Sequence, residues 1–443
     1  MAELTIRKNE ELSGIKKEVD EGAFEIVFQA IQEDIYSYPI RSFVRETISN
    51  GIDSHTERDI ALDIITNGAP ISKYYREEQD GLLLKDSVFN AEYYNPKYLS
   101  RDSTVTATYH ERPGYPRDYF EIADNGVGLH GDRLRGYFKI GYSTKRNLQA
   151  AIGKYGSGSK SGLATGVDYF VITSTYNGYK TSFMVFKQDY EPITQQNENG
   201  YTDTWKVTMA NGEERNIPIH WEPTTETNGV TVGVEVKKHN KEKFLTAVKT
   251  QFQYFDNVVL NTVKAEERPQ NIELSRGLLY QSDAVFLPKE SMYSVPHILV
   301  GGISYGPISW EELELENRKG QVALRVDAND VDITQSREAL KWTEKTRKTV
   351  LGVIDTCKKE ASEYMQTALP DLTAADTLLG KLKASKNTAA LRENKTIQAF
   401  SRFLCMSLIN PTIEFKVKNQ LVKNQVNEEL FDFIFYYFSV HSV

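Results

Sequence analysis

Three polar side chains on one helix-like segment have the spacing of a site for phosphate and a metal ion. Glu46, Asn50 and Asp53 stand at positions i, i+4 and i+7, so they project from one face of a helix. The residues around them are apolar, which would bury this face. A carboxylate and an amide oxygen one turn apart suit Mg2+, because this cation prefers oxygen ligands and keeps several waters. The alternative for this segment alone is an ordinary solvated helix face.

Two glycine-rich segments further along the chain could bring backbone N–H groups to the same ligand. The first, Asp124–Gly128, follows the strand-like residues 119–123, and the second is Gly153–Lys160. Glycine allows the backbone to approach a ligand closely and to present its N–H groups. Each segment alone is common as a surface turn, and neither the Gly-x-x-x-x-Gly-Lys-Ser/Thr loop nor the dinucleotide pattern is present. Because both segments follow the helix-like segment in this order along the sequence, a nucleotide pocket is favoured.

Together these segments resemble the boxes of the GHKL ATPases, the family of type II topoisomerases, the ninety-kilodalton heat-shock chaperone, histidine kinases and MutL. Arg45–Ser54 is especially similar to the chaperone's version, and Val326–Leu340 resembles the chaperone's catalytic loop. Still closer is the likeness to the rIIA-type rapid-lysis proteins of T-even phages, which extends patchily over residues 30–360. The segments that carry it are 39–55, 141–174, 301–305 and 332–348.

The resemblance implies hydrolysis of ATP with Mg2+ as cofactor. Glu46 would be the general base that polarises the attacking water. Arg337, from the chaperone-like loop, would reach the γ-phosphate and neutralise charge in the transition state. Asn50 would hold the magnesium ion, and Asp53 would orient waters or a neighbouring side chain. Asp124 would accept a hydrogen bond from the adenine amino group, which guanine lacks.

The same likeness makes residues 129–158 a lid over the nucleotide. The residues expected around its phosphates and base are Gly126, Gly128, Ser143, Thr144, Lys145, Gly153, Gly156, Ser157, Gly158, Ser159 and Lys160. Lys145 and Lys160 fit solvated lid residues equally well. Ser336 fits the N-cap of a helix that would begin after it, which offers a purely structural role for the neighbouring Arg337.

The expected fold class is α/β. The likeness divides the chain into a Bergerat-type α/β sandwich that binds ATP (residues 1–240), a second α/β domain (241–360) and a mainly helical C-terminal region (361–443). Apolar and alternating patterns predict the individual elements. Strands are expected at 103–110, 119–123, 168–173, 178–187, 204–209, 230–236, 298–305 and 321–326, and helices at 21–31 and 338–367.

The composition predicts a globular protein of the cytoplasm, which would be a host-cell cytoplasm if the chain is phage-encoded. Of 443 residues, 40% are apolar and 26% charged, which suits two or three domains with a core. The net charge of -8 disfavours nucleic acid as a partner but leaves a local basic groove open. The apolar run 431–438 is shorter than the ~20 residues of a spanning helix, so we expect no transmembrane segment, with membrane-peripheral contact as the alternative. Cys357 and Cys405 give no disulfide framework, and the histidines form no zinc spacing.

Four functions are compatible with such an ATPase. The first is an rIIA-like phage ATPase, a lid-closing switch that protects infection against host exclusion or defence and meets an unidentified host or phage protein. The second is a chaperone-like clamp that forms a homodimer on ATP binding. The third is a DNA-acting enzyme of the MutL or topoisomerase type, and the fourth binds ATP structurally with little turnover. Dimerisation, stimulation by DNA and the Glu46→Ala variant would separate them.

Overall fold

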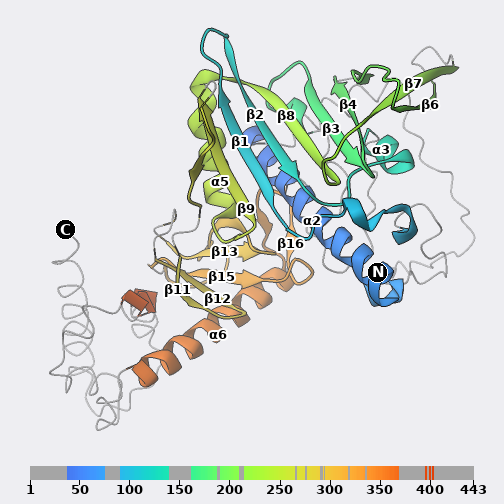
Figure 1. Ribbon diagram of the computed structural model, residues 1–443. Helices are drawn as coiled ribbons and strands as arrows, with labels where there is room; N and C mark the ends of the chain where they lie inside the picture. Colours follow the sequence, from blue (N-terminus) through green and yellow to red (C-terminus); the bar gives the residue numbers. More distant parts are fainter. Residues whose placement is uncertain are drawn as a thin grey trace, which may run out of the picture.

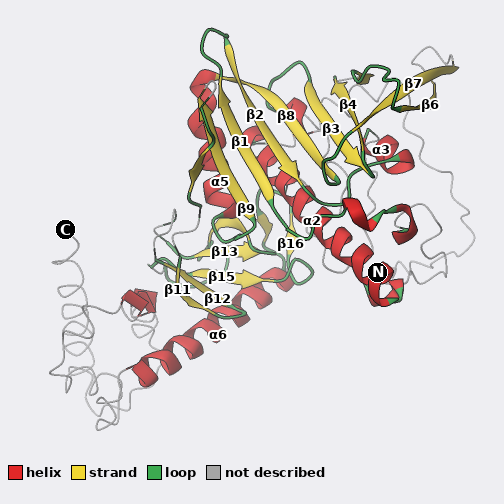
Figure 2. Ribbon diagram, in the orientation of Figure 1, coloured by secondary structure: helices red, strands yellow, loops and turns green. Residues whose placement is uncertain are grey.

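Two units make up the described part of the chain, and each consists of a β-sheet with helices packed on it (Figures 1 and 2). The computed structural model describes residues 37–74, 90–138, 161–186, 190–208, 214–264, 267–274, 277–289, 293, 295–317, 320–334, 337–368, 395–396, 399–400 and 402–403. The larger sheet lies above the smaller one in the view of Figure 1. This mixed architecture confirms the expected α/β fold class.

Within the described residues, the first sheet has ten strands and is almost entirely antiparallel. Its order is β10-β9-β1-β2-β8-β3-β4-β7-β6, with β5 beside β4. The strands are β1 (Val105–Glu111), β2 (Arg117–Asp124), β3 (Phe170–Tyr176), β4 (Tyr179–Val185), β5 (Tyr190–Pro192), β6 (Tyr201–Thr208), β7 (Glu214–Pro223), β8 (Gly229–Lys237), β9 (Val258–Lys264) and β10 (Gln270–Ile272). Among the described strands of this sheet, only β1 and β9 pair in parallel. Every second residue of β2 is buried up to Ile122, as expected where one face of a sheet is covered.

Helices cover that face. They are α2 (Pro39–Asn67), α3 (Gly131–Tyr137), α4 (Ser161–Ala164) and α5 (Lys241–Phe252), with short 3-10 turns η2 (Ile71–Lys73), η3 (Ala91–Tyr93), η4 (Pro96–Tyr98) and η6 (Lys238–Asn240). The rings of Phe43 on α2, Phe120 on β2 and Phe244 on α5 meet in the core with centroids 4.9 to 6.5 Å apart. α2 begins with Pro39, whose fixed φ suits a first helical position, and ends where Gly68 turns left-handed at φ 67°. The predicted helix around Glu46 is therefore confirmed.

The second unit is a five-stranded sheet in the order β11-β12-β15-β13-β14. Its elements are β11 (Leu278–Gln281), β12 (Val285–Pro288), β13 (His297–Val300), β14 (Ile303–Pro307), β15 (Ala323–Val326), the separate pair β16 (Asp332–Ile333) and β17 (Leu340–Lys341), and α6 (Glu344–Ala368). Val350, Ile354 and Cys357 of α6 are fully buried in its core. All four residues of β12 and of β13 are buried, because a second apolar cluster that includes Leu299 packs against Tyr254 on the other face.

Three expected boundaries differ from the structure. The helix predicted from residue 338 begins at Glu344, because Leu340–Lys341 pairs with β16 instead. The strand predicted at 298–305 is a hairpin of two, since Gly301 and Gly302 turn at φ 57° and 88°. The first sheet continues past residue 240, because β9 and β10 are two of its strands. The helix expected at 21–31 lies outside the described residues, as does most of the region after 368.

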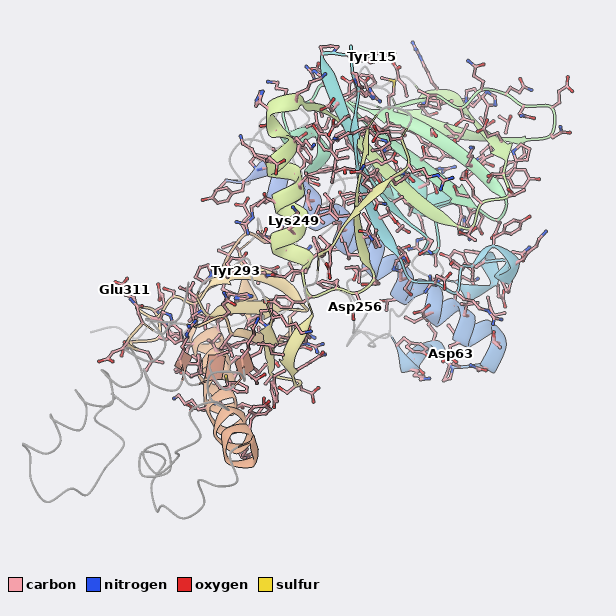
Figure 3. All side chains as sticks on the ribbon, turned by 60° about the vertical axis from the view of Figure 1, so that its left-hand side comes forward. Asp63, Tyr115, Lys249, Asp256, Tyr293 and Glu311 are labelled. Carbon is pink, nitrogen blue, oxygen red and sulfur yellow. The ribbon has the colours of Figure 1, made fainter. Side chains whose placement is uncertain are left out.

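The two units meet where α5 ends. The hydroxyl of Tyr254, just after α5, is hydrogen-bonded to Nε2 of His297 on β13 at 2.9 Å, and the two rings stack at 5.8 Å. In Figure 3, Asp63 on α2 and Tyr115 at the tip of the β1–β2 hairpin mark two far corners of the first unit, while Tyr293 lies on the second. Among the helices of the described residues, none is both long and apolar enough to cross a membrane.

The buried His297 predicts a loss of stability in acid. Burial lowers its pKa to about 4, against an ordinary value of 6.5. In the unfolded chain His297 therefore becomes protonated below about pH 6.5, whereas in the folded protein it becomes protonated only near pH 4. The free energy of unfolding should fall over this window by up to about 1.4 kcal/mol per pH unit for this group. Urea unfolding at a series of pH values measures it.

His297→Gln should make that decline shallower without removing it. The pKa of His55 is also lowered to about 4, first by burial and then by the charge of Arg58, so His55 contributes to the same window. His239→Gln is the matched control, because His239 lies exposed in η6. An unchanged pH dependence in His297→Gln would contradict the assignment.

Candidate nucleotide-binding site

α2 brings the first two predicted segments together. Glu46 and Asp53 are 4% and 0% exposed, and Asn50 between them is half-buried. Directly after Asn50, Gly51 packs against the end of β2, where a Cβ on this glycine would lie 3.0 Å from the Cβ of Asp124. The three polar residues of α2 and the carboxylate at the end of β2 therefore border one region.

The turn after Asp124 is fixed by its own hydrogen bonds and by α2. The Asp124 carboxylate accepts a hydrogen bond from the N–H of Gly126 at 2.9 Å, and the N–H of Val127 donates to Ser54 Oγ at 3.0 Å. A Cβ on Gly126 would overlap Ser54, and one on Gly128, at φ 71°, would overlap the carbonyl of Thr175. Close packing within the protein thus already requires both glycines, whatever their contact with a base.

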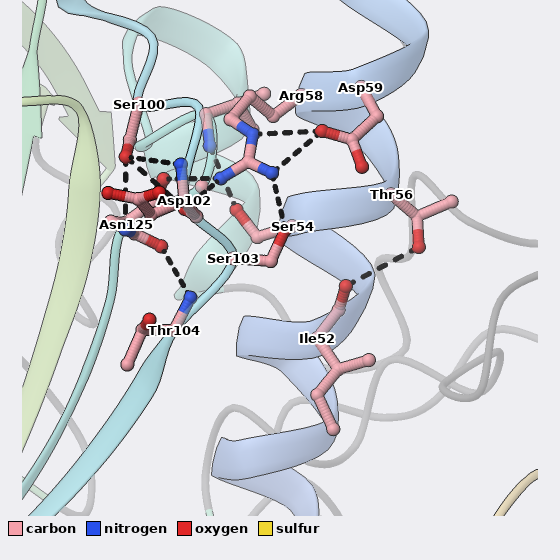
Figure 4. A network of polar contacts seen from close by, with 12 residues as sticks. Ile52, Ser54, Thr56, Arg58, Asp59, Ser100, Asp102, Ser103, Thr104 and Asn125 are labelled. Atoms are coloured by element: carbon pink, nitrogen blue, oxygen red, sulfur yellow. Dashed lines mark hydrogen bonds and ion pairs between the residues drawn. The ribbon is translucent and has the colours of Figure 1, made fainter. Parts of the chain in front are cut away.

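Arg58, one helical turn after Ser54 on α2, holds the same turn (Figure 4). Its guanidinium donates to the carbonyl of Asp102 and to Ser103 Oγ, both at 2.6 Å, and more distantly to the carbonyl of Asn125. The Asn125 side chain accepts from the N–H of Thr104 and donates to Ser100, which closes the network. Although Arg58 is 1% exposed, it also pairs with the exposed Asp59. Arg58 therefore ties α2 to the turn that carries Asp124.

The described start of the predicted lid is anchored to the same helix. Arg133 on α3 forms a buried ion pair with Glu57 of α2 at 2.5 Å and also donates to Tyr94. Phe138, which caps α3, stacks on Tyr190 with ring centroids 4.0 Å apart. Burial, and then the charge of Asp124, raises the pKa of Tyr137 above its ordinary value, so this phenol stays neutral beside the carboxylate. The sequence offered no sign of Tyr137 beyond its place after the Asp-Gly turn.

The remaining predicted lid residues lie outside the described residues. They are Ser143, Thr144, Lys145, Gly153, Gly156, Ser157, Gly158, Ser159 and Lys160. Their roles stay predictions.

Arg337 of the second unit reaches Glu46. Its Nη1 donates to Glu46 Oε2 at 2.9 Å, and the arginine is only 3% exposed. Burial opposes the positive charge of Arg337, but Glu46, followed by Tyr305 and Asp53, raises its pKa above the ordinary value. Arg337 has φ 58° and precedes α6 by seven residues, so it does not stand in that helix's first turn. The structure thus pairs the two predicted catalytic residues across 291 positions of sequence.

Three residues that sequence reasoning missed support this contact. Arg45, 1% exposed, donates from Nε to Gln251 of α5 at 2.7 Å, and its guanidinium lies 5.0 Å from the ring centroid of Tyr305. Tyr305 packs against the cores of both units. Gln251 also donates to the carbonyl of Arg41, which fixes α5 to α2. Of the three, Arg45 lay in the segment 39–55 and Tyr305 in 301–305, both of which the sequence analysis had singled out, whereas Gln251 lay in neither.

The donor set fits a nucleotide-bound magnesium ion. Such an ion takes most of its ligands from phosphate and water and needs one or two from protein, which the Asn50 amide beside two carboxylates can supply. Within the described ranges, no group of three or more His, Cys, Asp or Glu residues is placed to hold a metal on its own.

Comparison with known families agrees with this geometry. Residues 38–214 match the model of the histidine kinase-, DNA gyrase B-, and HSP90-like ATPase family. The match covers under half of the chain, contains α2 and the Asp-Gly turn, and ends before Arg337. It supports a GHKL-type ATPase domain in this region, for which ATP binding is expected. No curated protein matches the chain.

Arg58→Ala should weaken both the fold and ATP binding. It removes a buried charged donor from its carbonyl and hydroxyl acceptors, so the free energy of unfolding should fall by roughly 2–3 kcal/mol. The loosened turn should place Asp124 less well, which raises the Kd for ATP. Urea unfolding and calorimetric titration with ATP measure the two effects.

Arg347→Ala is the matched control. Arg347 pairs with Glu312 at 2.5 Å, but both side chains are more than 40% exposed, so the cost should stay below about 1 kcal/mol. Equal losses in the two variants would show that Arg58 has no special role in holding the turn.

Proposed function

We propose that this chain hydrolyses Mg-ATP, with Glu46 as general base and Arg337 as the arginine that neutralises charge on the phosphate. The observation that carries the proposal is the meeting of these two residues, from separate units, beside Asn50 and Asp53 on α2. The family match over residues 38–214 supports the nucleotide-binding half of it.

Each side chain would have one task in the reaction. Asp124 accepts a hydrogen bond from the adenine amino group, which selects adenine over guanine. Glu46 accepts a proton from the attacking water. Arg337 donates to the γ-phosphate oxygens as negative charge builds there. Asp53 orients waters between helix and phosphate. Asn50 would hold the Mg2+ ion, which would supply further charge neutralisation.

The ion pair between Arg337 and Glu46 suits a hydrolysis step that begins only after nucleotide has bound. One guanidinium faces the carboxylate at 2.9 Å, and the γ-phosphate would present a second anion to it. Transfer of Arg337 from carboxylate to phosphate would free Glu46 to meet water. Hydrolysis would then require both the bound nucleotide and the docked second unit.

The purpose we propose is that of an rIIA-like phage ATPase, a cytoplasmic switch that counteracts host exclusion or defence. The segments 39–55, 301–305 and 332–348 support it, since they contain the first half of α2, Tyr305 and Arg337, which meet in the site. A chaperone-like clamp is the second candidate, because the catalytic arginine comes from a separate unit. It would dimerise when ATP binds.

The first test is ATP binding and hydrolysis with and without magnesium. Wild type should turn over ATP only with Mg2+, while Glu46→Ala should bind it and lose roughly 10²- to 10⁴-fold in kcat, the usual contribution of a general base. Asp124→Asn should fail to bind, since it loses the charge that accepts from adenine and from Gly126. Absence of magnesium-dependent ATP binding by wild type would refute the proposal.

Asp63→Asn serves as control in the same assays. Asp63 lies on α2 near its C-terminal end, where it pairs with Lys73 away from Asp124. Its kcat and KM should equal those of wild type. Size-exclusion chromatography of Glu46→Ala with ATP, and assays with added DNA, test the purpose: a dimer favours the clamp, and stimulation by DNA favours a DNA-acting enzyme over both.

A double-mutant cycle tests the ion pair itself. Arg337→Ala should lower kcat by about 10²- to 10³-fold, the usual effect of removing a donor to the transition state, with little change in ATP affinity. It should also cost roughly 3–5 kcal/mol of stability, because the Glu46 carboxylate stays buried without that partner. The double variant with Glu46→Ala should cost less than the sum of the single losses, as urea unfolding would show. Additive losses would mean that the pair contributes nothing.

A further inference from the structure

The residue after Arg337 also grips α2. Glu338 accepts hydrogen bonds from the N–H of Ser37 at 3.0 Å and of Tyr38 at 2.7 Å. It also accepts from the hydroxyl of Ser42 at 2.9 Å. These donors stand at the start of α2, some 300 positions away in sequence. One carboxylate of the second unit therefore meets three donors of the first.

α2 has no comparable group of its own at this end. Its N-cap residue, Tyr38, makes no side-chain cap, and its first turn contains no acidic residue. The first N–H groups of a helix lack intrahelical partners and favour negative charge. Glu338 supplies both an acceptor and the charge from the second unit.

Arg337 and Glu338 contact consecutive turns of one helix face. Ser42, the partner of Glu338, and Glu46, the partner of Arg337, stand four residues apart on α2. The described residues around Arg337 and Glu338 are tied together, because the N–H of Thr334 donates to the carbonyl of Ala339 and the N–H of Arg337 donates to the carbonyl of Thr334. Arg337 and Glu338 are thus held next to each other where both side chains meet α2.

We propose that Glu338 is a positioning residue for the ATPase reaction: its carboxylate docks on the start of α2 and so sets where Arg337 meets Glu46. The inference rests on the proposed function for its catalytic consequence, while the docking itself stands on geometry. Without Glu338, the hydrogen bonds among Thr334, Arg337 and Ala339 remain, but Arg337 loses the neighbouring contact that fixes its position on α2. Arg337 then reaches the transition state less often, whereas Asp124 and Asn50 bind ATP as before.

Loss of Glu338 leaves the two units in contact. Arg45 still lies over Tyr305, and Tyr254 still bonds to His297. Glu338→Ala should accordingly fold, and Glu338→Gln keeps an acceptor if the alanine variant proves unstable.

The experiment combines kinetics with hydrogen exchange. Glu338→Ala should lower kcat at least about tenfold, as expected for a lost charge-assisted hydrogen bond, and leave the KM for Mg-ATP within about twofold. Glu338→Gln should recover part of kcat, and Ser42→Ala should lower it in the same direction. The amides of Ser37 and Tyr38 should exchange faster with D2O in Glu338→Ala than in wild type.

Glu360→Ala is the matched control. The Glu360 carboxylate on α6 likewise accepts two side-chain hydrogen bonds, from Tyr280 and Ser282, but within the second unit. Its loss should change neither kcat nor exchange at Ser37 and Tyr38.

Three results would overturn the inference in distinguishable ways. An unchanged kcat in Glu338→Ala, with an active wild type, removes the positioning role alone. Unchanged exchange at Ser37 and Tyr38 removes the docking. A wild type that does not hydrolyse ATP removes the proposed function, and with it the catalytic consequence, while the exchange comparison still decides whether Glu338 docks on α2.

Discussion

The buried ion pair between Arg337 and Glu46 is the constraint on which the relation of the two units depends. Moving two charges out of water costs several kcal/mol each, which their attraction repays only when geometry and neighbouring hydrogen bonds are good. The structure provides these neighbours from both units. Glu338 fixes the arginine's loop on the helix start, and Arg45 stacks on Tyr305 beside it. Because burial of the two charges costs free energy, the ion pair is better explained by the relative position of the two units that it fixes than by a gain in folding stability.

α2 connects this contact between the units to the rest of the candidate site. Its first turns meet the loop of the second unit, its middle packs at Gly51 against the end of β2, and its later turns hold the Asp-Gly turn through Ser54 and Arg58. Since the helix is a single element of 29 residues, it joins the contacts at its start to the turn where Asp124 lies. The residues of the second unit that meet α2 and the turn that carries Asp124 are therefore connected through one helix.

The local sequence pattern predicted most helices and strands. Contacts between residues far apart in the sequence were predicted only where a family resemblance suggested them. The period of apolar residues around Glu46 and the alternation before Asp124 are properties of a few neighbouring residues, so the helix and the strand were foreseen. The helix start at Glu344 was missed, because Leu340–Lys341 takes its pairing from β16 and not from its own propensity. Gln251 and Tyr305 matter only after folding brings α5 and β14 to Arg45, and no spacing in the sequence encodes that.

The charges around the Arg337–Glu46 ion pair explain how bound nucleotide would break this pair in the proposed reaction. Arg337 lies near both Glu46 and Asp53, and Arg45 lies near Glu46 with Arg41 beside it, so positive and negative groups already offset one another without ATP. Bound triphosphate adds more negative charge than one Mg2+ removes. Because the fields of all these groups are weakly screened in a buried site, the added anion would draw the guanidinium of Arg337 away from Glu46. Release of phosphate would restore the original balance and return Arg337 to the carboxylate, so the docking of the second unit would follow the state of the nucleotide.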